Sequence, residues 1–135
     1  ALNVIILRPE KERVNLTNAS YNPHWNTINI YKVSNFKSPA KFEETFLHEM
    51  GHVFGKLTYK EKKQLLAGLR ESNFIHPSEY AKTNKEEWFA EAFVSTLYLS
   101  GEIHSIDRGR YTNLDSFEGS RAFYSIKQMW KRQNY

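Results

Sequence analysis

The chain has 135 residues, of which 40% are hydrophobic, 25% are charged and 15% are aromatic. This length and composition predict a single folded domain, residues 1–135, with one hydrophobic core. The net charge is +4, but the basic residues are spread along the chain without an aromatic-interleaved motif, so we expect no nucleic-acid partner. No apolar run is long enough to span a bilayer. The absence of cysteine excludes disulfides and leaves histidine and carboxylates as the strong metal ligands.

Two apolar segments near the start of the chain predict β-strands. Residues 3–8 are β-branched and end at Pro9, which indicates a buried strand. Residues 27–33 alternate between apolar and polar side chains, so that Ile28 and Ile30 should face the core. Residues 15–23, which lie between the two segments, are predicted to form a polar turn region.

A helix is predicted to begin at Ser38-Pro39, because serine is a favoured N-cap and proline is tolerated at the first helical position. We expect this helix to end near Phe54, with Gly55 as its stop. The helix contains the segment His48-Glu49-Met50-Gly51-His52, whose residue types and spacing indicate chemistry.

His48 and His52 are spaced i, i+4, so they share one face of the helix and can hold one metal ion with Glu49 beside it. In a chain with five histidines this pattern arises by chance about twice in a hundred shuffles, so the motif alone is a hypothesis. The alternative is a pair of surface histidines without a metal. Gly51 argues against it, because a mid-helix glycine costs about 1 kcal/mol relative to alanine and is better tolerated where something approaches closely.

The helix predicted at residues 84–100 supplies the carboxylates that such a site needs. Glu87 and Glu91 are also spaced i, i+4 and share a face of a helix whose other positions are mostly apolar. Because an unpaired buried charge is very costly, these carboxylates require cations or hydrogen-bond donors. A zinc ion and the N–H of a ligand imidazole would supply them. The alternative is that both are ordinary surface glutamates.

The other segments are predicted to support this pair of helices. Residues 59–73 form a charged amphipathic helix with Lys62 on its outer face. Residues 101–116 are loop-like, and Asp115 with Glu118 resembles a capping box for a last helix that runs close to the C-terminus.

The sequence resembles the anthrax lethal factor-type zinc peptidases, a family that includes secreted bacterial Pro-Pro endopeptidases. The resemblance rests on the segment 48–52, on Glu87-Trp88-Phe89-Ala90-Glu91-Ala92-Phe93, and on Tyr80, which lies seven residues before Glu87. It covers about residues 25–98. It implies an α+β fold, a mainly helical zincin-like metallopeptidase domain with a small β-sheet before the active-site helix. It also implies a secreted protein, which we expect to be a monomer.

The resemblance implies a zinc endopeptidase of the gluzincin type. His48, His52 and Glu87 would hold Zn²⁺ through two nitrogens and one oxygen and leave a fourth position for water. Zinc would lower the pKa of that water towards about 7. Glu49 would act as general base, taking the proton of the water and later passing it to the leaving amine.

Further residues receive roles from the same resemblance. Tyr80 would donate its hydroxyl to the oxyanion of the tetrahedral intermediate, unless it is a packing tyrosine. Glu91 would orient a ligand histidine. The substrate, an extended peptide or protein, would pair with the strand at 27–33, which makes Asn29 and Tyr31 candidate substrate contacts.

Two alternatives to a free-standing peptidase stay open on the sequence. One is a non-catalytic zincin-like domain that binds a protein partner or a structural zinc. The other is the peptidase domain of a larger secreted toxin, which differs in biology and not in chemistry. The chain begins at Ala1 without a basic-then-apolar leader, so we expect a signal peptide to be absent or already removed.

Overall fold

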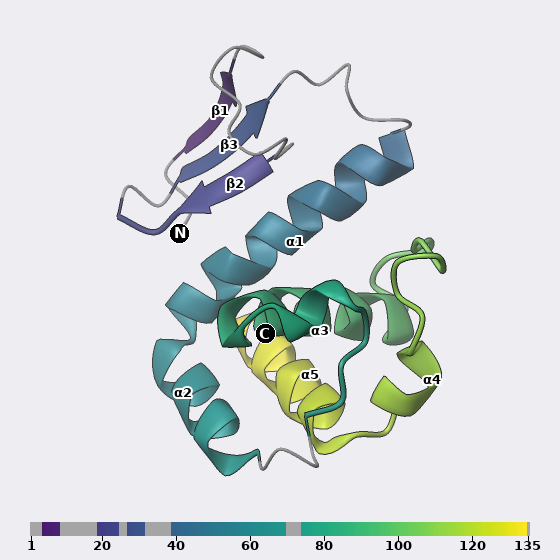
Figure 1. Ribbon diagram of the computed structural model, residues 1–135. Coiled ribbons are helices and arrows are strands. Elements are labelled where there is room, and N and C mark those ends of the chain that lie inside the picture. Colours follow the sequence, from purple (N-terminus) through teal and green to yellow (C-terminus); the bar gives the residue numbers. More distant parts are fainter. Residues whose placement is uncertain (1–3, 9–18, 25–26, 32–38, 70–73, 135) are drawn as a thin grey trace.

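A small β-sheet and a group of helices pack on opposite sides of one long helix, α1, in the computed structural model of the chain (Figure 1). The structure describes residues 4–8, 19–24, 27–31, 39–69 and 74–134. The fold is α+β and mainly helical, as predicted. None of the helices in these ranges is long and apolar enough to cross a membrane.

The sheet of the described residues has the strand order β1-β3-β2. Strands β1 (Val4–Arg8) and β3 (Thr27–Tyr31) pair in parallel, and β2 (Ala19–Asn22) pairs antiparallel with β3. The predicted strands at 3–8 and 27–33 are therefore confirmed, although residues 3, 32 and 33 lie outside the described residues.

Strand β2 corrects the prediction of a polar turn region at residues 15–23, of which 15–18 lie outside the described residues. Its sequence, Ala-Ser-Tyr-Asn, lacks the β-branched residues that mark a strand, and pairing with β3 holds it in the sheet. The position of β3 is a second correction. Because β3 has a neighbour on each side, it is the central strand and cannot offer a free edge to a substrate.

Helix α1 (Pro39–Leu57) begins at the predicted proline, whereas the predicted N-cap Ser38 lies outside the described residues. The expected stop at Gly55 is wrong, because the helix continues for two residues beyond it. A Cβ at Gly55 would lie 3.0 Å from Cδ of Lys62, so this glycine leaves room for a neighbouring side chain instead of ending the helix.

Helix α2 (Tyr59–Gly68) follows almost directly and ends earlier than predicted, while residues 70–73 lie outside the described residues. Lys62 is buried, which corrects its predicted place on the outer face. After the short 3₁₀ helix η4 (Tyr80–Lys82), helix α3 (Lys85–Leu99) occupies the predicted segment. Its N-cap Asn84 accepts a hydrogen bond of 2.8 Å from the backbone N–H of Glu87.

The C-terminal part contains two helices where the sequence predicted one. Helix α4 (Leu114–Phe117) and helix α5 (Arg121–Asn134) are separated by a turn in which Gly119 has φ of 82°. The predicted capping box is wrong, because Asp115 lies inside α4. Ser120 caps α5 instead, and its Oγ accepts a hydrogen bond of 3.2 Å from the backbone N–H of Phe123.

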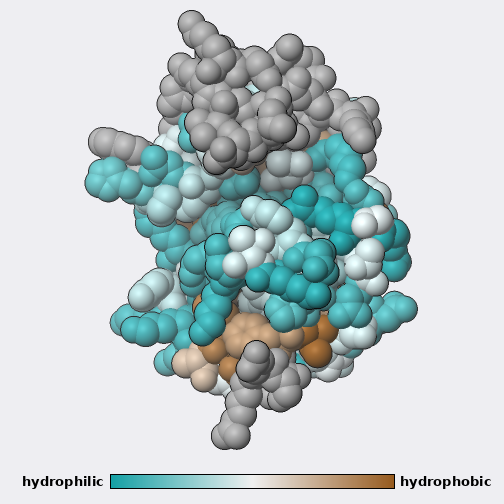
Figure 2. Space-filling view, viewed as in Figure 1, coloured by the Kyte–Doolittle hydropathy of each residue, from teal (hydrophilic) through white to brown (hydrophobic). Residues whose placement is uncertain are grey.

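Two clusters of buried side chains hold these elements together. The larger surrounds α3, which is buried along most of its length, and includes Trp88, Phe93 and Ile126. The smaller joins the sheet to α1 through Ile28, Ile30 and Val53. The surface in Figure 2 is mostly hydrophilic, with hydrophobic residues gathered in one area towards the bottom of the view.

The helices α1 and α3 pack against each other at Gly51 and Ala90. A Cβ at Gly51 would lie only 2.9 Å from Cα of Ala90. Glycine is therefore required for the two backbones to come this close. This contact places the histidine-bearing face of α1 beside the glutamate-bearing face of α3.

Candidate metal centre

Three candidate ligands from two helices meet at the α1–α3 interface. His48 and His52 lie one helical turn apart on α1, and Glu87 lies in the first turn of α3. The Nε2 atom of His52 is 2.6 Å from Oε1 of Glu87, and Nε2 of His48 is 3.4 Å from Oε2 of the same carboxylate. One ligand atom from each residue lies within 4.8 Å of the others.

The chemistry of this donor set fits zinc. Two imidazole nitrogens and one carboxylate oxygen form one of the ligand combinations found in catalytic zinc sites, which keep a fourth position open. His48 uses Nδ1 for a hydrogen bond with Glu91, at 2.9 Å, so its Nε2 is the nitrogen that faces Glu87. The three donors therefore lie close enough together to hold a single metal ion.

The charges of His48 and Glu87 also favour a cation at this place. Burial lowers the pKa of His48, but its hydrogen bonds with Glu87 and Glu91 outweigh this effect and raise the pKa to about 9. Burial raises the pKa of Glu87, but its contacts with His48, His52 and Tyr80 outweigh burial and hold the pKa well below its usual range. The carboxylate of Glu87 thus stabilises positive charge on His48, and a metal ion would take the place of that proton.

Glu91 is a fully buried carboxylate behind His48, with a side chain that is 0% exposed. Its Oε2 accepts hydrogen bonds from Nδ1 of His48 at 2.9 Å and from the hydroxyl of Tyr111 at 2.6 Å. Its Oε1 accepts hydrogen bonds from Oγ of Ser78 and from Nε of Arg110, both at 2.9 Å. Each carboxylate oxygen therefore has two donors, which is the full capacity of an ionised glutamate.

The pKa of Glu91 agrees with this arrangement. Burial raises it, but the hydrogen bond with His48 and the charge of Arg110 outweigh burial and lower the pKa to about 2. Sequence reasoning predicted that Glu91 needed cations or donors but missed Ser78, Arg110 and Tyr111. The last two lie in a segment predicted only to be loop-like, and nothing in its residue pattern indicated which side chains would turn inward.

Glu49 and Tyr80 lie close to the three candidate ligands. Glu49 is 7% exposed, and burial raises the pKa of its carboxyl group. Tyr80 comes from η4, and its ring centroid is 5.7 Å from that of His48. Burial, followed by contact with Glu87, raises the pKa of the Tyr80 phenol well above its usual range. The guanidinium of Arg110 lies 5.1 Å from the centroid of the Tyr80 ring.

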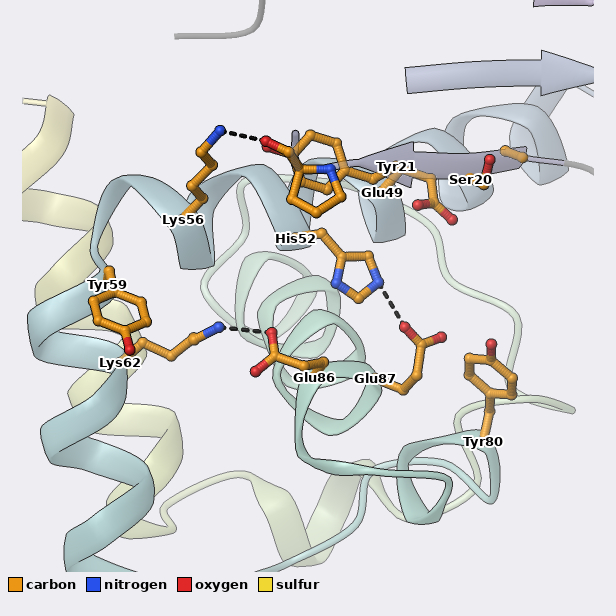
Figure 3. Close-up of a pocket in the computed structure, with 12 residues that line it drawn as sticks. Ser20, Tyr21, Glu49, His52, Lys56, Tyr59, Lys62, Tyr80, Glu86 and Glu87 are labelled. Atoms are coloured by element: carbon orange, nitrogen blue, oxygen red, sulfur yellow. Dashed lines mark hydrogen bonds and ion pairs between the residues drawn. The ribbon is translucent and has the colours of Figure 1, made fainter. Parts of the chain in front are cut away.

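A cavity of about 520 Å³ lies beside these residues, between β2, α1, the start of α2 and α3 (Figure 3), and His48 and Arg110 are not among the residues that line it. At one end, the cavity is lined by Glu49, His52, Tyr80 and Glu87. The strand residues that line it come from β2 and not from β3. The predicted substrate contacts Asn29 and Tyr31 are not among the lining residues. The other lining residues are Ala19, Ser20, Tyr21, Pro23, Lys56, Tyr59, Lys62 and Glu86.

Comparisons with protein-family models, curated proteins and solved structures found no match to this chain. The relation to lethal factor-type peptidases therefore rests on the sequence segments alone and stays a prediction.

Proposed function

We propose that the protein is a zinc-dependent endopeptidase that hydrolyses an extended peptide or protein substrate. The observation that carries this proposal is the meeting of His48, His52 and Glu87, with ligand atoms within 4.8 Å of one another, in a site that also contains the carboxylate of Glu49. A structural metal site needs only the ligands. A hydrolytic site also needs a base beside them and a cavity that admits a substrate.

Bound zinc would supply a Lewis acid that polarises the scissile carbonyl and lowers the pKa of water towards about 7. Glu49 would act as the general base, taking a proton from the attacking water and returning it to the leaving amine. Burial raises the pKa of Glu49, which makes the carboxylate a stronger base than an exposed glutamate. Its position on α1, directly after His48, would put it beside the reacting atoms.

Tyr80 would stabilise the oxyanion that forms when water attacks the carbonyl. This role requires a protonated phenol, and the raised pKa of Tyr80 keeps the proton in place at neutral pH. Arg110 packs against the Tyr80 ring and also bonds to Glu91, so one guanidinium supports both the oxyanion donor and the carboxylate behind His48.

A substrate strand would pair with β2. This strand is an edge of the described sheet and lines the cavity through Ala19, Ser20 and Tyr21. An extended peptide bound there would add a strand to the sheet and pass the candidate ligands. The strand at residues 19–22, and not the predicted segment 27–33, would therefore bind the substrate.

The decisive test is the substitution Glu49→Gln, with Glu43→Gln as its matched control. Glu43 is exposed on the same helix and does not line the cavity. The Glu49 variant should keep the helical circular dichroism spectrum and one bound zinc per chain but cleave no member of a peptide library. The control should cleave like the wild type.

Cleavage by the metal-verified Glu49→Gln protein would show that Glu49 is not the base. A wild-type protein that binds zinc and yields no product from the library, with or without chelator, would be a binding domain and not a peptidase.

A further inference from the structure

The cavity extends beyond the candidate ligands to a basic end. Lys56, Tyr59 and Lys62 line this end, and in Figure 3 they lie on the opposite side of His52 and Glu87 from Tyr80. Sequence spacing agrees with the view. Lys56 follows His52 by four residues and so lies one turn further along the same face of α1. Lys62 bonds to Glu86, the residue directly before Glu87.

The side chain of Lys62 lines the cavity and is mostly buried. Its side chain is 9% exposed, and its ammonium lies 5.7 Å from the centroid of the Phe89 ring. Its aliphatic stem lies against Gly55, where the missing side chain leaves room for it. Its Nζ is 2.7 Å from Oε2 of Glu86, whose side chain is 62% exposed. The charge of Lys62 is therefore matched by a carboxylate that faces solvent.

Lys56 has a different partner. Its Nζ donates a 2.6 Å hydrogen bond to the backbone carbonyl of Pro23, which carries no charge. Among the described residues that line this end of the cavity, Lys56 and Lys62 carry two positive charges and Glu86 carries one negative charge, which leaves one positive charge. An ammonium with a neutral acceptor keeps two further N–H donors and its full charge for a ligand.

We propose that the basic end of the cavity is a subsite for a carboxylate of the substrate, bound by Lys56 with Lys62 behind it. The proposal rests on the peptidase function proposed above. The carboxylate comes either from an acidic side chain or from the C-terminus of the peptide. Four residues of helix rise about 6 Å, which is about two residues of an extended peptide. The carboxylate should therefore lie about two residues from the scissile bond.

The test uses zinc-loaded Glu49→Gln protein and fluorescent peptides of otherwise uncharged sequence. A single Glu, Gln or Lys is scanned through every position, and each peptide is made with a C-terminal acid and with a C-terminal amide. Anisotropy titrations at low ionic strength give the dissociation constants. One Glu position should bind up to about fivefold more tightly than Gln, the upper range for a solvent-accessible ion pair, and added salt should reduce the difference. A gain confined to the C-terminal acid would identify the terminal carboxylate as the ligand.

Variants of Lys56 decide whether this residue is responsible. Lys56→Gln should abolish the preference, and Lys56→Glu should reverse it in favour of Lys peptides. Lys60→Glu is the matched control, because Lys60 is exposed on α2 outside the cavity lining, and it should leave the preference unchanged. A scan without preference for Glu or for the terminal acid, or a preference that survives in Lys56→Gln, would overturn the subsite.

The outcomes also separate the two proposals. Selective binding of carboxylate peptides by a protein whose wild type cleaves nothing would refute the peptidase function and support the subsite. Cleavage by the wild type together with a flat scan would refute the subsite alone.

Discussion

Replacing Gly51 by alanine tests whether the close contact between α1 and α3 determines the geometry of the candidate metal site. The added Cβ would lie 2.9 Å from Cα, 3.1 Å from the carbonyl oxygen and 3.2 Å from Cβ of Ala90. Two of these neighbours are backbone atoms of the partner helix, which no side-chain rotation can remove. Because carbon atoms prefer separations of about 3.5–4.0 Å, the helices must move apart by roughly 0.6 Å or more.

The expected loss of stability is the difference between two effects. Alanine improves helix propensity over glycine by about 1 kcal/mol. Overpacking a well-packed interface costs about 1–3 kcal/mol, and the backbone neighbours at Gly51 favour the upper part of that range. The free energy of unfolding should therefore fall by about 1–2 kcal/mol. Because the histidines lie on α1 and Glu87 on α3, the same displacement should weaken zinc binding.

Gly55→Ala is the matched control on the same helix. Its Cβ would lie 3.0 Å from Cδ of Lys62 and 3.3 Å from the Phe89 ring, and the lysine side chain can shift. This variant should be within about 1 kcal/mol of the wild type, because the gain in helix propensity offsets the smaller clash. Urea unfolding with chelator present gives the stabilities, and competition with a fluorescent chelator gives the zinc affinities. A Gly51→Ala protein with wild-type stability and zinc affinity would refute the reasoning.

Three further predictions concern single side chains of the site. Glu87→Ala should lower the zinc affinity by more than about a hundredfold, because it removes one of the three candidate ligands. Glu86→Ala is the control and should change the zinc affinity by less than about twofold. Equal losses of affinity in a chelator competition would contradict the assignment of Glu87. Tyr80→Phe should lower kcat by about a hundredfold while leaving zinc affinity unchanged, and an unchanged kcat would exclude Tyr80 as the oxyanion donor. Because the pKa of Glu91 falls from 4.5 to about 2 on folding, its ionised form stabilises the native state above pH 4.5, and this contribution is lost as pH falls through about 2. The difference between these two pKa values corresponds to about 3 kcal/mol of folding stability. Between pH 6 and 2, the free energy of unfolding measured in urea should therefore fall more steeply for the wild type than for Glu91→Gln. Parallel curves of unfolding free energy against pH would contradict this prediction.

Helical periodicity was sufficient to predict which residues share a face, because a helix imposes the same spacing on any sequence. His48 with His52 and Glu87 with Glu91 could each be paired in this way. Periodicity does not say which faces of two helices meet. The close approach of Gly51 to Ala90 determines that here, and the sequence indicated only that a glycine in mid-helix needs a reason.

Two of the failed predictions share a physical cause, which is that tertiary contacts overrode a local signal. Strand β2 has weak strand propensity and exists because it pairs with β3. Lys62 has the charge of a surface residue, but its stem is buried beside Gly55 and Phe89, and its ammonium bonds to Glu86, which faces solvent. None of these contacts can be recognised from the residues that are neighbours in the sequence.

The hydrogen bonds of Glu91 show how far the site depends on segments outside the motif. Its four donors come from α1 (His48), from the segment before η4 (Ser78) and from the loop before α4 (Arg110 and Tyr111). Removing one loop donor would leave a buried anion short of a partner, which costs about 1–3 kcal/mol or more for a charged group. The carboxylate would then bind His48 in a less defined orientation. A graft of the two helical motifs onto another helix pair would therefore reproduce the candidate ligands but not the hydrogen bonds that direct Nε2 of His48 towards Glu87.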